Sequence, residues 1–250
     1  MNSSGKEILG GKNVALEVLK AGRRKVYRIF WGRKSKDATS EELMQLAHLQ
    51  KIPVVEAHPD KITSLTESEE HQGVAIEVSP FVYAELGDVT AAAKNRQGGF
   101  LLLMDEIQDP HNVGALIRTA HLCGASGVVL LKHRQSPVNM TVCKSAAGAQ
   151  EYLPIVQETN LVNVINYLKK NNFFVWGAAG EGSTSLFKAE PSFPLALVMG
   201  AEGRGLRRLV RENCDALIHI PMEGEVGSFN VSVAGGIFMA EILRNRVASS

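Results

Sequence analysis

The stretch F-L-L-L-M-D-E-I-Q-D-P-H-N-V-G-A-L-I-R-T-A, residues 100–120, decides the fold class of this chain. It begins with an apolar run, Phe100–Met104, and passes through a polar turn into the pattern of an amphipathic helix. A continuous apolar run of this length is typical of a strand buried on both faces of a parallel sheet. Asp109-Pro110 marks the helix start, because an N-cap aspartate followed by proline is a common beginning. The stretch therefore predicts a strand, a turn and a helix of an α/β domain.

The rest of the C-terminal part repeats this pattern of short apolar runs and amphipathic segments. A mainly parallel sheet with helices on both faces is therefore expected over residues 100–250. The further predicted strands are Gly127–Leu131, Phe173–Ala178, Leu195–Met199 and Ala216–Ile220, and the predicted helices are Asn112–Cys123, Leu161–Asn171, Leu206–Asn213 and Asn230–Val247.

The N-terminal part predicts a second, smaller α/β domain over residues 1–80. A first helix should end near Gly22, and a second should cover Glu41–Leu49 with Thr39 or Ser40 as its cap. Residues 81–99, which end in Gly98-Gly99, predict a partly helical linker. The expected strands are Val26–Trp31, Ile52–Val55 and Gly73–Val78.

Composition is that of an ordinary globular protein, with 250 residues, 45% of them hydrophobic and 21% charged. No apolar run is long enough for a membrane span, and no leader sequence is visible, so neither export nor a membrane location is expected. The three cysteines are widely spaced, and the seven histidines form no metal-binding pattern. We expect a reduced, cytoplasmic protein without a metal site.

The formal net charge of +1 hides an uneven distribution of charged residues. Residues 1–36 hold ten Lys/Arg against two acidic residues, whereas residues 37–99 hold four against eleven. A basic patch of this kind attracts phosphate groups, which would suit a nucleic-acid partner. A solvated face is an equally good interpretation of the same pattern.

Two further segments place glycines and polar residues at the end of an apolar run. Leu197–Leu206 reads L-V-M-G-A-E-G-R-G-L, and Ile220–Ala234 reads I-P-M-E-G-E-V-G-S-F-N-V-S-V-A. Open α/β sheets bind ligands at the carboxyl ends of their strands, so the three segments together predict a binding site. Taken singly, each also fits a simpler role as a capped helix, a tight turn or a crowded helix start.

Two further features of this region have both a structural and a functional interpretation. Arg204, Arg207, Arg208 and Arg211 would share one helix face, either solvated or in contact with a phosphodiester backbone. Gly235-Gly236 lies inside a predicted helix, where each glycine costs on the order of 1 kcal/mol relative to alanine. That cost predicts close packing of another helix or of a second subunit.

The three segments resemble, in order and spacing, the motifs of the SpoU group of SPOUT RNA 2′-O-ribose methyltransferases. The matching residues read D-x-I-x-D-P-x-N-x-G-x-x-x-R-T-A, L-x-x-G-x-E-x-x-G-L and I-P-M-x-G-x-x-x-S-F-N-V-S-V-A. The N-terminal part, with His71-Gln-Gly73 before a strand, resembles the RNA-binding domain similar to ribosomal protein L30e that precedes the catalytic domain in this group. The likeness is greatest to the bacterial 23S rRNA guanosine-2′-O-methyltransferases, although Phe229 stands where the family usually has leucine.

This resemblance implies an α/β protein with a small L30e-like N-terminal domain and a C-terminal methyltransferase domain that contains a trefoil knot. It also implies S-adenosylmethionine as cofactor, RNA as substrate, with 23S rRNA favoured, and a homodimer formed through the C-terminal domain. The implied cofactor-binding residues are Leu197, Gly200, Ile220, Met222 and Phe229, and the implied catalytic residues are Asn112, Arg118, Glu202, Ser228 and Asn230.

Within the implied reaction, Arg118 is expected to position the target phosphate and hydroxyl, because a guanidinium with a pKa above about 12 is a poor base. Asn112 would orient Arg118, and the group that accepts the ribose proton stays open.

Three other functions fit parts of the pattern. They are methylation of tRNA by the same family, RNA binding without catalysis, and nucleotide-dependent oxidoreduction, which normally carries a G-x-G-x-x-G motif that is missing here.

Overall fold

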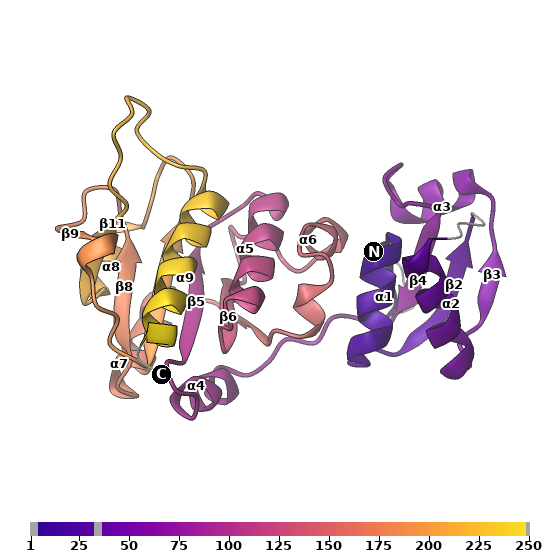
Figure 1. Cartoon of the computed structure of the whole chain (residues 1–250), viewed down its shortest axis with the longest axis horizontal. Coiled ribbons are helices and arrows are strands. Elements are labelled where there is room, and N and C mark those ends of the chain that lie inside the picture. Colours follow the sequence, from indigo (N-terminus) through magenta and orange to yellow (C-terminus); the bar gives the residue numbers. More distant parts are fainter. Residues whose placement is uncertain (1–4, 33–36, 249–250) are drawn as a thin grey trace. The chain divides into compact units, whose positions relative to one another are not determined.

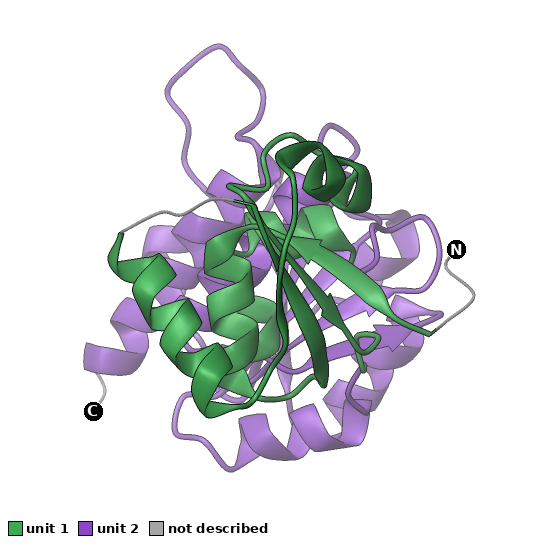
Figure 2. Cartoon of the chain, turned by 90° about the vertical axis from the view of Figure 1, so that its right-hand side faces the viewer, with its two compact units in different colours: residues 1–82, 138–152 green, residues 83–137, 153–250 purple. Residues whose placement is uncertain are grey.

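The computed structural model describes residues 5–32 and 37–248, which form two compact units. The first unit comprises Met1–Val82 together with Val138–Tyr152, and the second comprises Tyr83–Pro137 together with Leu153–Ser250 (Figure 2). The three motif-like segments all belong to the second unit. Among the described residues, no helix combines the length and apolar character that a membrane crossing requires.

The first unit is a small α/β domain built on a four-stranded sheet with the order β1-β4-β2-β3 (Figure 1). Only the β2–β3 pair is parallel. Sequence patterns missed β1 (Glu7–Gly10), α3 (Pro59–Thr66) and α6 (Met140–Ser145). They also placed the cap of α2 wrongly, since the Asp37 side chain accepts the hydrogen bond from the Ser40 amide. The elements are β1 (Glu7–Gly10), α1 (Lys12–Ala21), β2 (Val26–Trp31), α2 (Ala38–Leu49), β3 (Val54–Glu56), α3 (Pro59–Thr66), β4 (Val74–Val78), α6 (Met140–Ser145) and the 3-10 turn η1 (Ala149–Glu151).

Most of the described basic residues near the N-terminus are paired with acidic groups of the same unit. Arg24 is buried, donates hydrogen bonds to Glu7 and to the Ser79 carbonyl, and lies 3.6 Å from the Glu151 carboxylate. Only Arg23 and Lys25 of this basic group are exposed and form no ion pair among the described residues. Four others form ion pairs, namely Lys6 and Arg28 with Glu77, Lys12 with Asp37 and Lys20 with Glu42, while Arg33, Lys34 and Lys36 lie outside the described residues.

The second unit contains a seven-stranded sheet with the order β7-β6-β5-β10-β8-β11-β9, in which every pairing is parallel. The predicted parallel sheet is therefore confirmed, with β7 and the two-residue β9 as strands that the sequence patterns missed. The strands are β5 (Phe100–Asp105), β6 (Gly127–Leu131), β7 (Ile155–Glu158), β8 (Phe174–Ala178), β9 (Thr184–Ser185), β10 (Leu195–Gly200) and β11 (Ala216–His219). The helices are α4 (Leu86–Lys94), α5 (Pro110–Leu122), α7 (Leu161–Lys170), α8 (Arg208–Asn213) and α9 (Val231–Ala248), with a 3-10 turn η2 (Leu186–Lys188).

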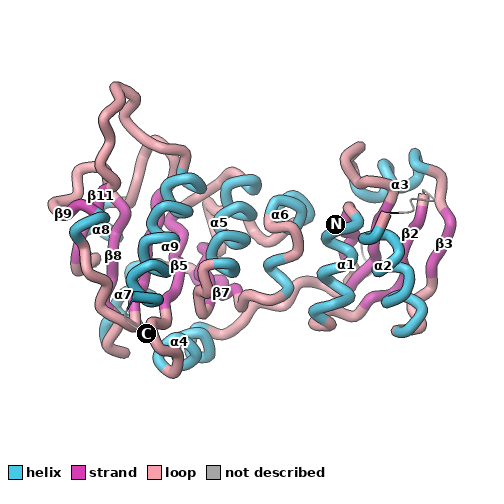
Figure 3. Tube along the Cα trace, viewed as in Figure 1, coloured by secondary structure: helices cyan, strands magenta, loops and turns pink. Residues whose placement is uncertain are grey.

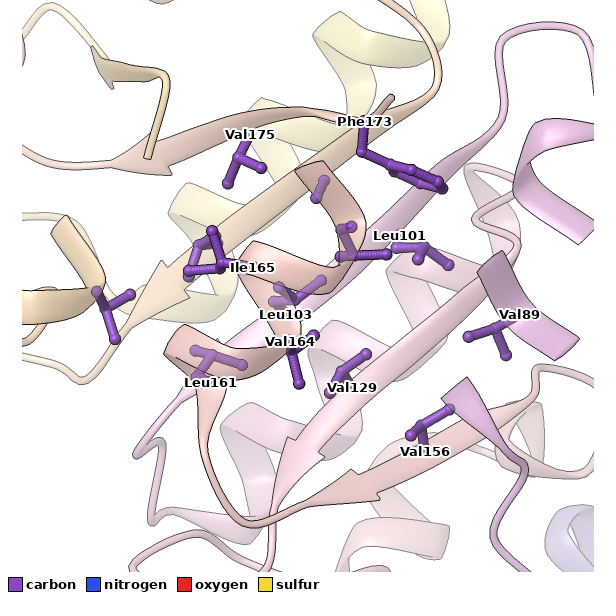
Figure 4. Packing of buried hydrophobic residues seen from close by; sticks show 14 of the residues in the cluster. Val89, Leu101, Leu103, Val129, Val156, Leu161, Val164, Ile165, Phe173 and Val175 are labelled. Carbon is purple, nitrogen blue, oxygen red and sulfur yellow. The ribbon is translucent and has the colours of Figure 1, made fainter. Parts of the chain in front are cut away.

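Alternate residues of the central strands pack on opposite faces of this sheet. Leu101 and Leu103 of β5 pack in one buried cluster with Val164 of α7 and Val89 of α4 (Figure 4). The other face is covered by α5 and α9, which contact each other and lie on β6 and β10 respectively. Both faces of the sheet are buried, which explains why the central strands have continuous apolar sequences.

Residues 86–94, which were expected as part of a linker, contribute to this core. They form α4, and its Val89 and Ala93 are fully or almost fully buried in the cluster of the second unit. The alanine-rich sequence hides this role, because small residues give a weak apolar pattern.

Candidate functional site

The three motif-like segments follow β5, β10 and β11, so they meet at the carboxyl edge of the parallel sheet. Gly200, the last residue of β10, is paired in register with Asp105, the last residue of β5. The third segment comprises the loop between β11 and α9, which has no regular structure, and the first turn of α9 (Figure 3). This is the edge at which open parallel sheets bind ligands, as the sequence predicts.

The first segment forms a capped helix whose apolar side is buried. The Asp109 carboxylate accepts a hydrogen bond from the His111 amide at 2.9 Å, and Pro110 is the first residue of α5. The predicted buried side of α5 is confirmed, since Val113, Leu116, Ile117 and Ala120 are fully buried. On the same helix Asn112 is buried toward the site, whereas Arg118 is exposed.

The second segment is a tight turn that depends on three glycines, Gly200, Gly203 and Gly205. Gly203 and Gly205 have positive φ angles of 76° and 64°. Gly200 lies so close to the returning chain that a Cβ there would come within 2.2 Å of the Gly205 carbonyl carbon. The Gly205 amide donates to the Ala201 carbonyl at 2.8 Å and closes the turn. The turn therefore presents backbone groups and the Glu202 side chain on its outer side.

A short chain of hydrogen bonds links the three segments. The Asn230 side-chain Nδ2 donates to Asn112 Oδ1 at 3.0 Å, and Asn112 Nδ2 donates to the Glu202 carboxylate at 3.4 Å. Asn230 also caps α9 by accepting from the Ser232 amide at 2.9 Å. Three of the five expected catalytic residues are thus in direct contact, although they come from three different parts of the chain.

A cavity of about 250 Å³ opens beside this chain of hydrogen bonds. Its wall includes the turn after β10, the loop after β11 and the first turn of α9. Four of the five expected cofactor-binding residues line it, and the fifth, Leu197, is fully buried within β10 and does not. The four are Gly200, Ile220, Met222 and Phe229, and the expected catalytic residues Glu202 and Ser228 line the same cavity.

A second cavity of about 200 Å³ adjoins the first. It is lined by Asn112 and by the residues that follow β5. It shares Ala201, Glu202, Arg204, Gly205 and Val231 with the first cavity. Glu202 therefore faces both cavities. Two ligands that must react with each other could be held side by side at such a site.

Arg118 stands apart from these contacts. It lines neither cavity, and within the described part of the chain it has no hydrogen-bond or ion-pair partner. Within the described residues the Asn112 side chain is hydrogen-bonded to Glu202 and Asn230 and not to Arg118, so an orienting role for Asn112 stays a prediction. An exposed, unpaired guanidinium is free to contact a phosphate of an incoming ligand.

Sequence patterns missed an ion pair that anchors the second segment to the first. Asp105, whose side chain is fully buried, accepts from the Arg207 amide at 2.9 Å and from its Nε at 2.6 Å. Burial raises the pKa of Asp105, and the bonds and charge of Arg207 act in the opposite direction. An acidic residue directly after a buried strand was the only signal of this pair in the sequence.

Arg204 of the second segment and the three arginines that follow it do not form the expected helical stripe. α8 begins only at Arg208, and Arg207 before it has an extended backbone. Arg208 pairs with Glu212, Arg211 with Glu181 and Arg207 with Asp105. The four arginines therefore do not share one continuous helix face.

The glycine pair of α9 has two different environments. A Cβ on Gly235 would come within 2.3 Å of the Leu116 side chain, so close packing against α5 explains this glycine. A Cβ on Gly236 would meet nothing within 4 Å.

The described residues contain no group of three or more side chains that could hold a metal ion.

Comparison with known proteins agrees with this geometry. The model of the SpoU rRNA Methylase family matches residues 99–240, and a model described as RNA 2′-O ribose methyltransferase substrate binding matches residues 8–84. Among solved structures, the SpoU methyltransferase AviRb from Streptomyces viridochromogenes in complex with AdoMet has a TM-score of 0.82 at 22% identity, over 98% of this chain and 92% of that one.

Curated relatives match over nearly the whole chain. A protein of Bacillus subtilis named putative TrmH family tRNA/rRNA methyltransferase YacO is 38% identical over 94% of this chain and 94% of its own length. The 23S rRNA (guanosine-2′-O-)-methyltransferase RlmB of Pectobacterium atrosepticum is 36% identical over 96% of this chain and 98% of its own length. On these matches, the chain belongs to the SpoU rRNA methylase family.

Proposed function

We propose that this chain, an RNA methyltransferase that uses S-adenosylmethionine, methylates the ribose 2′-hydroxyl of a guanosine in 23S rRNA. The single observation that carries the proposal is the chain of hydrogen bonds from Asn230 through Asn112 to Glu202 beside two adjoining cavities. A protein that only binds RNA has no need to join three distant segments at a two-part site. An oxidoreductase would need a dinucleotide motif that the turn after β10 lacks.

The first cavity has the chemistry that S-adenosylmethionine requires. Its inner wall combines apolar side chains with glycine backbone, which suits an adenine ring. Two nitrogen atoms of residues in the wall, Arg211 Nε and His219 Nδ1, are buried without a hydrogen-bond partner. Gly200, Ile220, Met222 and Phe229 would hold the cofactor there, with backbone contacts and apolar surface. Phe229 in place of leucine keeps the contact apolar.

When bound, S-adenosylmethionine supplies a methyl group on a positively charged sulfur, which becomes a neutral thioether as the ribose 2′-oxygen takes the methyl and the hydroxyl releases its proton. The residues of this chain then act by orientation and charge placement. Glu202 is held by Asn112 at the boundary of both cavities, and Ser228 lines the first. Asn112 and Asn230 fix the relative positions of the three segments, and Arg118 positions the target phosphate and stabilises the developing charge on the 2′-oxygen.

Guanosine in 23S rRNA is proposed as the target because two of the relatives are named as 23S rRNA (guanosine-2′-O-)-methyltransferases. Other relatives are named only as tRNA/rRNA methyltransferases. Mapping 2′-O-methyl groups in rRNA and tRNA from a strain that lacks this protein distinguishes these substrates. Loss of one methylguanosine from 23S rRNA supports the proposal, and loss of a tRNA methyl group would assign the enzyme to tRNA.

We also propose that the first unit binds RNA, with Arg23 and Lys25 in contact with phosphates. The double substitution Arg23→Gln, Lys25→Gln should lower affinity and reduce the slope of log affinity against log salt by about 1.4 to 1.8, which is the effect of two lost phosphate contacts. Lys20→Gln, at a position paired with Glu42, is the matched control and should leave the slope unchanged. An unchanged slope in the double variant would make this basic group a solvated face.

A homodimer formed through the second unit is the proposed assembly. Helix α9 has apolar residues on all sides, and its Val233 is 52% exposed while Leu122 of α5 is 71% exposed. Gly236 faces open space in the single chain, so a second copy would account for it. Val233→Glu should yield monomers in light scattering, whereas Leu209→Glu on the exposed side of α8 should not. A dimer that survives Val233→Glu would place the interface elsewhere.

A further inference from the structure

One part of the first cavity is lined by charged side chains that lie outside the three motif-like segments. Glu181 comes from the loop after β8, Arg211 from α8, and His219 is the last residue of β11. The remaining wall combines glycine backbone and apolar side chains, such as Ile220 and Phe238, with Glu202 and Arg204 of the second segment. Within this wall, Glu181, Arg211 and His219 form a charged part that lies outside the motif-like segments.

The charged part has hydrogen-bonding capacity that the protein leaves unused. The Arg211 guanidinium pairs with the Glu181 carboxylate through Nη2, yet its Nε is buried without a partner. His219 Nδ1 is likewise buried without a partner. Buried polar atoms are nearly always hydrogen-bonded in folded proteins. Two unpaired nitrogens on side chains that line the same cavity therefore point to a ligand that pairs with these side chains when it binds.

We propose that Glu181, Arg211 and His219 bind the amino-acid end of S-adenosylmethionine. Arg211 and His219 hold its carboxylate, and Glu181 holds its ammonium group. The assignment rests on the proposed function, because it takes this cavity as the cofactor site. It assigns a specific role to three residues that the motifs of the family do not include.

Charge complementarity selects this end of the cofactor over the other. The amino-acid end carries one negative and one positive group, and the charged part of the cavity offers a cation and an anion side by side. Adenine is uncharged and aromatic, so it fits the backbone and apolar part of the wall. A carboxylate left without partners in a half-buried cavity would be costly, which makes these side chains a determinant of affinity for the intact amino-acid end.

Two ligands separate the contributions of the two ends in titration calorimetry with the full chain. S-adenosylhomocysteine carries the amino-acid end, and 5′-methylthioadenosine lacks it. Arg211→Gln should weaken S-adenosylhomocysteine about ten-fold or more and change the affinity for methylthioadenosine less than about two-fold, because a charge-assisted hydrogen bond is lost only with the first ligand. Arg208→Gln, on the same helix but paired with Glu212 outside the cavity, is the matched control and should change neither affinity.

Two further variants test the same site independently, in case Arg211→Gln loses affinity because it is misfolded. His219→Ala and Glu181→Gln should each reduce the preference for S-adenosylhomocysteine over methylthioadenosine by at least a few-fold, with thermal unfolding measured on the same samples. Equal weakening of both ligands would place the adenosine end here and overturn the assignment. An unchanged preference in all three variants would overturn it as well, while the proposed function would stand. Wild-type protein that binds neither nucleoside would overturn both.

Discussion

Replacing Arg118 with alanine is expected to lower the rate of methyl transfer by about 10²-fold to 10³-fold or more, the usual effect of removing a group that stabilises charge in a transition state. Arg118 is exposed on α5, lines neither cavity and has no partner within the described residues. Cofactor affinity should therefore stay near the wild-type value. Single-turnover rates with excess enzyme, alongside the dissociation constant of S-adenosylhomocysteine, measure the two effects separately.

The control for this experiment is Arg244→Ala. Arg244 is an exposed arginine of α9 that is paired with Glu241 of the same helix, so its loss should affect neither measurement. Arg118→Lys keeps the charge but not the planar two-pronged geometry, and should recover only part of the rate. Turnover of Arg118→Ala at the wild-type rate would remove Arg118 from the mechanism.

Gly200→Ala is expected to abolish measurable cofactor binding. A Cβ at this position would come within 2.2 Å of the Gly205 carbonyl carbon and 2.5 Å of the Leu206 amide nitrogen, so the turn would have to open. The contacts are with backbone rather than with a flexible side chain, and the strain should also cost about 1–3 kcal/mol of stability. Calorimetry with S-adenosylhomocysteine and a denaturant titration check the two parts of this prediction.

Gly87→Ala serves as the matched glycine substitution. Gly87 lies in α4, where the nearest atom to an added Cβ is the Tyr167 hydroxyl at 3.9 Å. Alanine is favoured over glycine in a helix by about 1 kcal/mol, so this variant should keep cofactor binding and gain slightly in stability. Wild-type cofactor affinity in Gly200→Ala would show that the turn after β10 does not shape the cavity.

The parallel sheet could be predicted from the sequence because its central strands are buried on both faces. Runs such as Phe100–Met104 contain no polar residue, and turn signals or helix caps bound them. The short strand β9 gave no such signal, since its two residues, Thr184 and Ser185, have no pattern of their own. Local order in such a strand comes from its neighbour β11 rather than from its composition.

The site was partly predictable for a similar reason. Helix caps and glycine turns are local patterns, so Asn112, Glu202 and Asn230 could be selected in advance by their likeness to family motifs. Contacts over long sequence distances could not be selected in this way, and the pair of Asp105 with Arg207 spans 102 residues. The prediction of an arginine stripe was wrong because it requires a helix that includes Arg204, whereas α8 begins at Arg208. The trefoil knot stays a prediction of the family resemblance.

The most direct test of the central claim is an assay with purified protein, S-adenosylmethionine carrying a labelled methyl group, and two substrates in parallel, 23S rRNA and bulk tRNA from a strain that lacks the protein. Digestion to nucleosides and mass spectrometry identify the methylated product. The expected result is label in 2′-O-methylguanosine from 23S rRNA, absent with Arg118→Ala. Label on a base, label only in tRNA, or no transfer to either RNA by protein that binds S-adenosylhomocysteine would contradict the account.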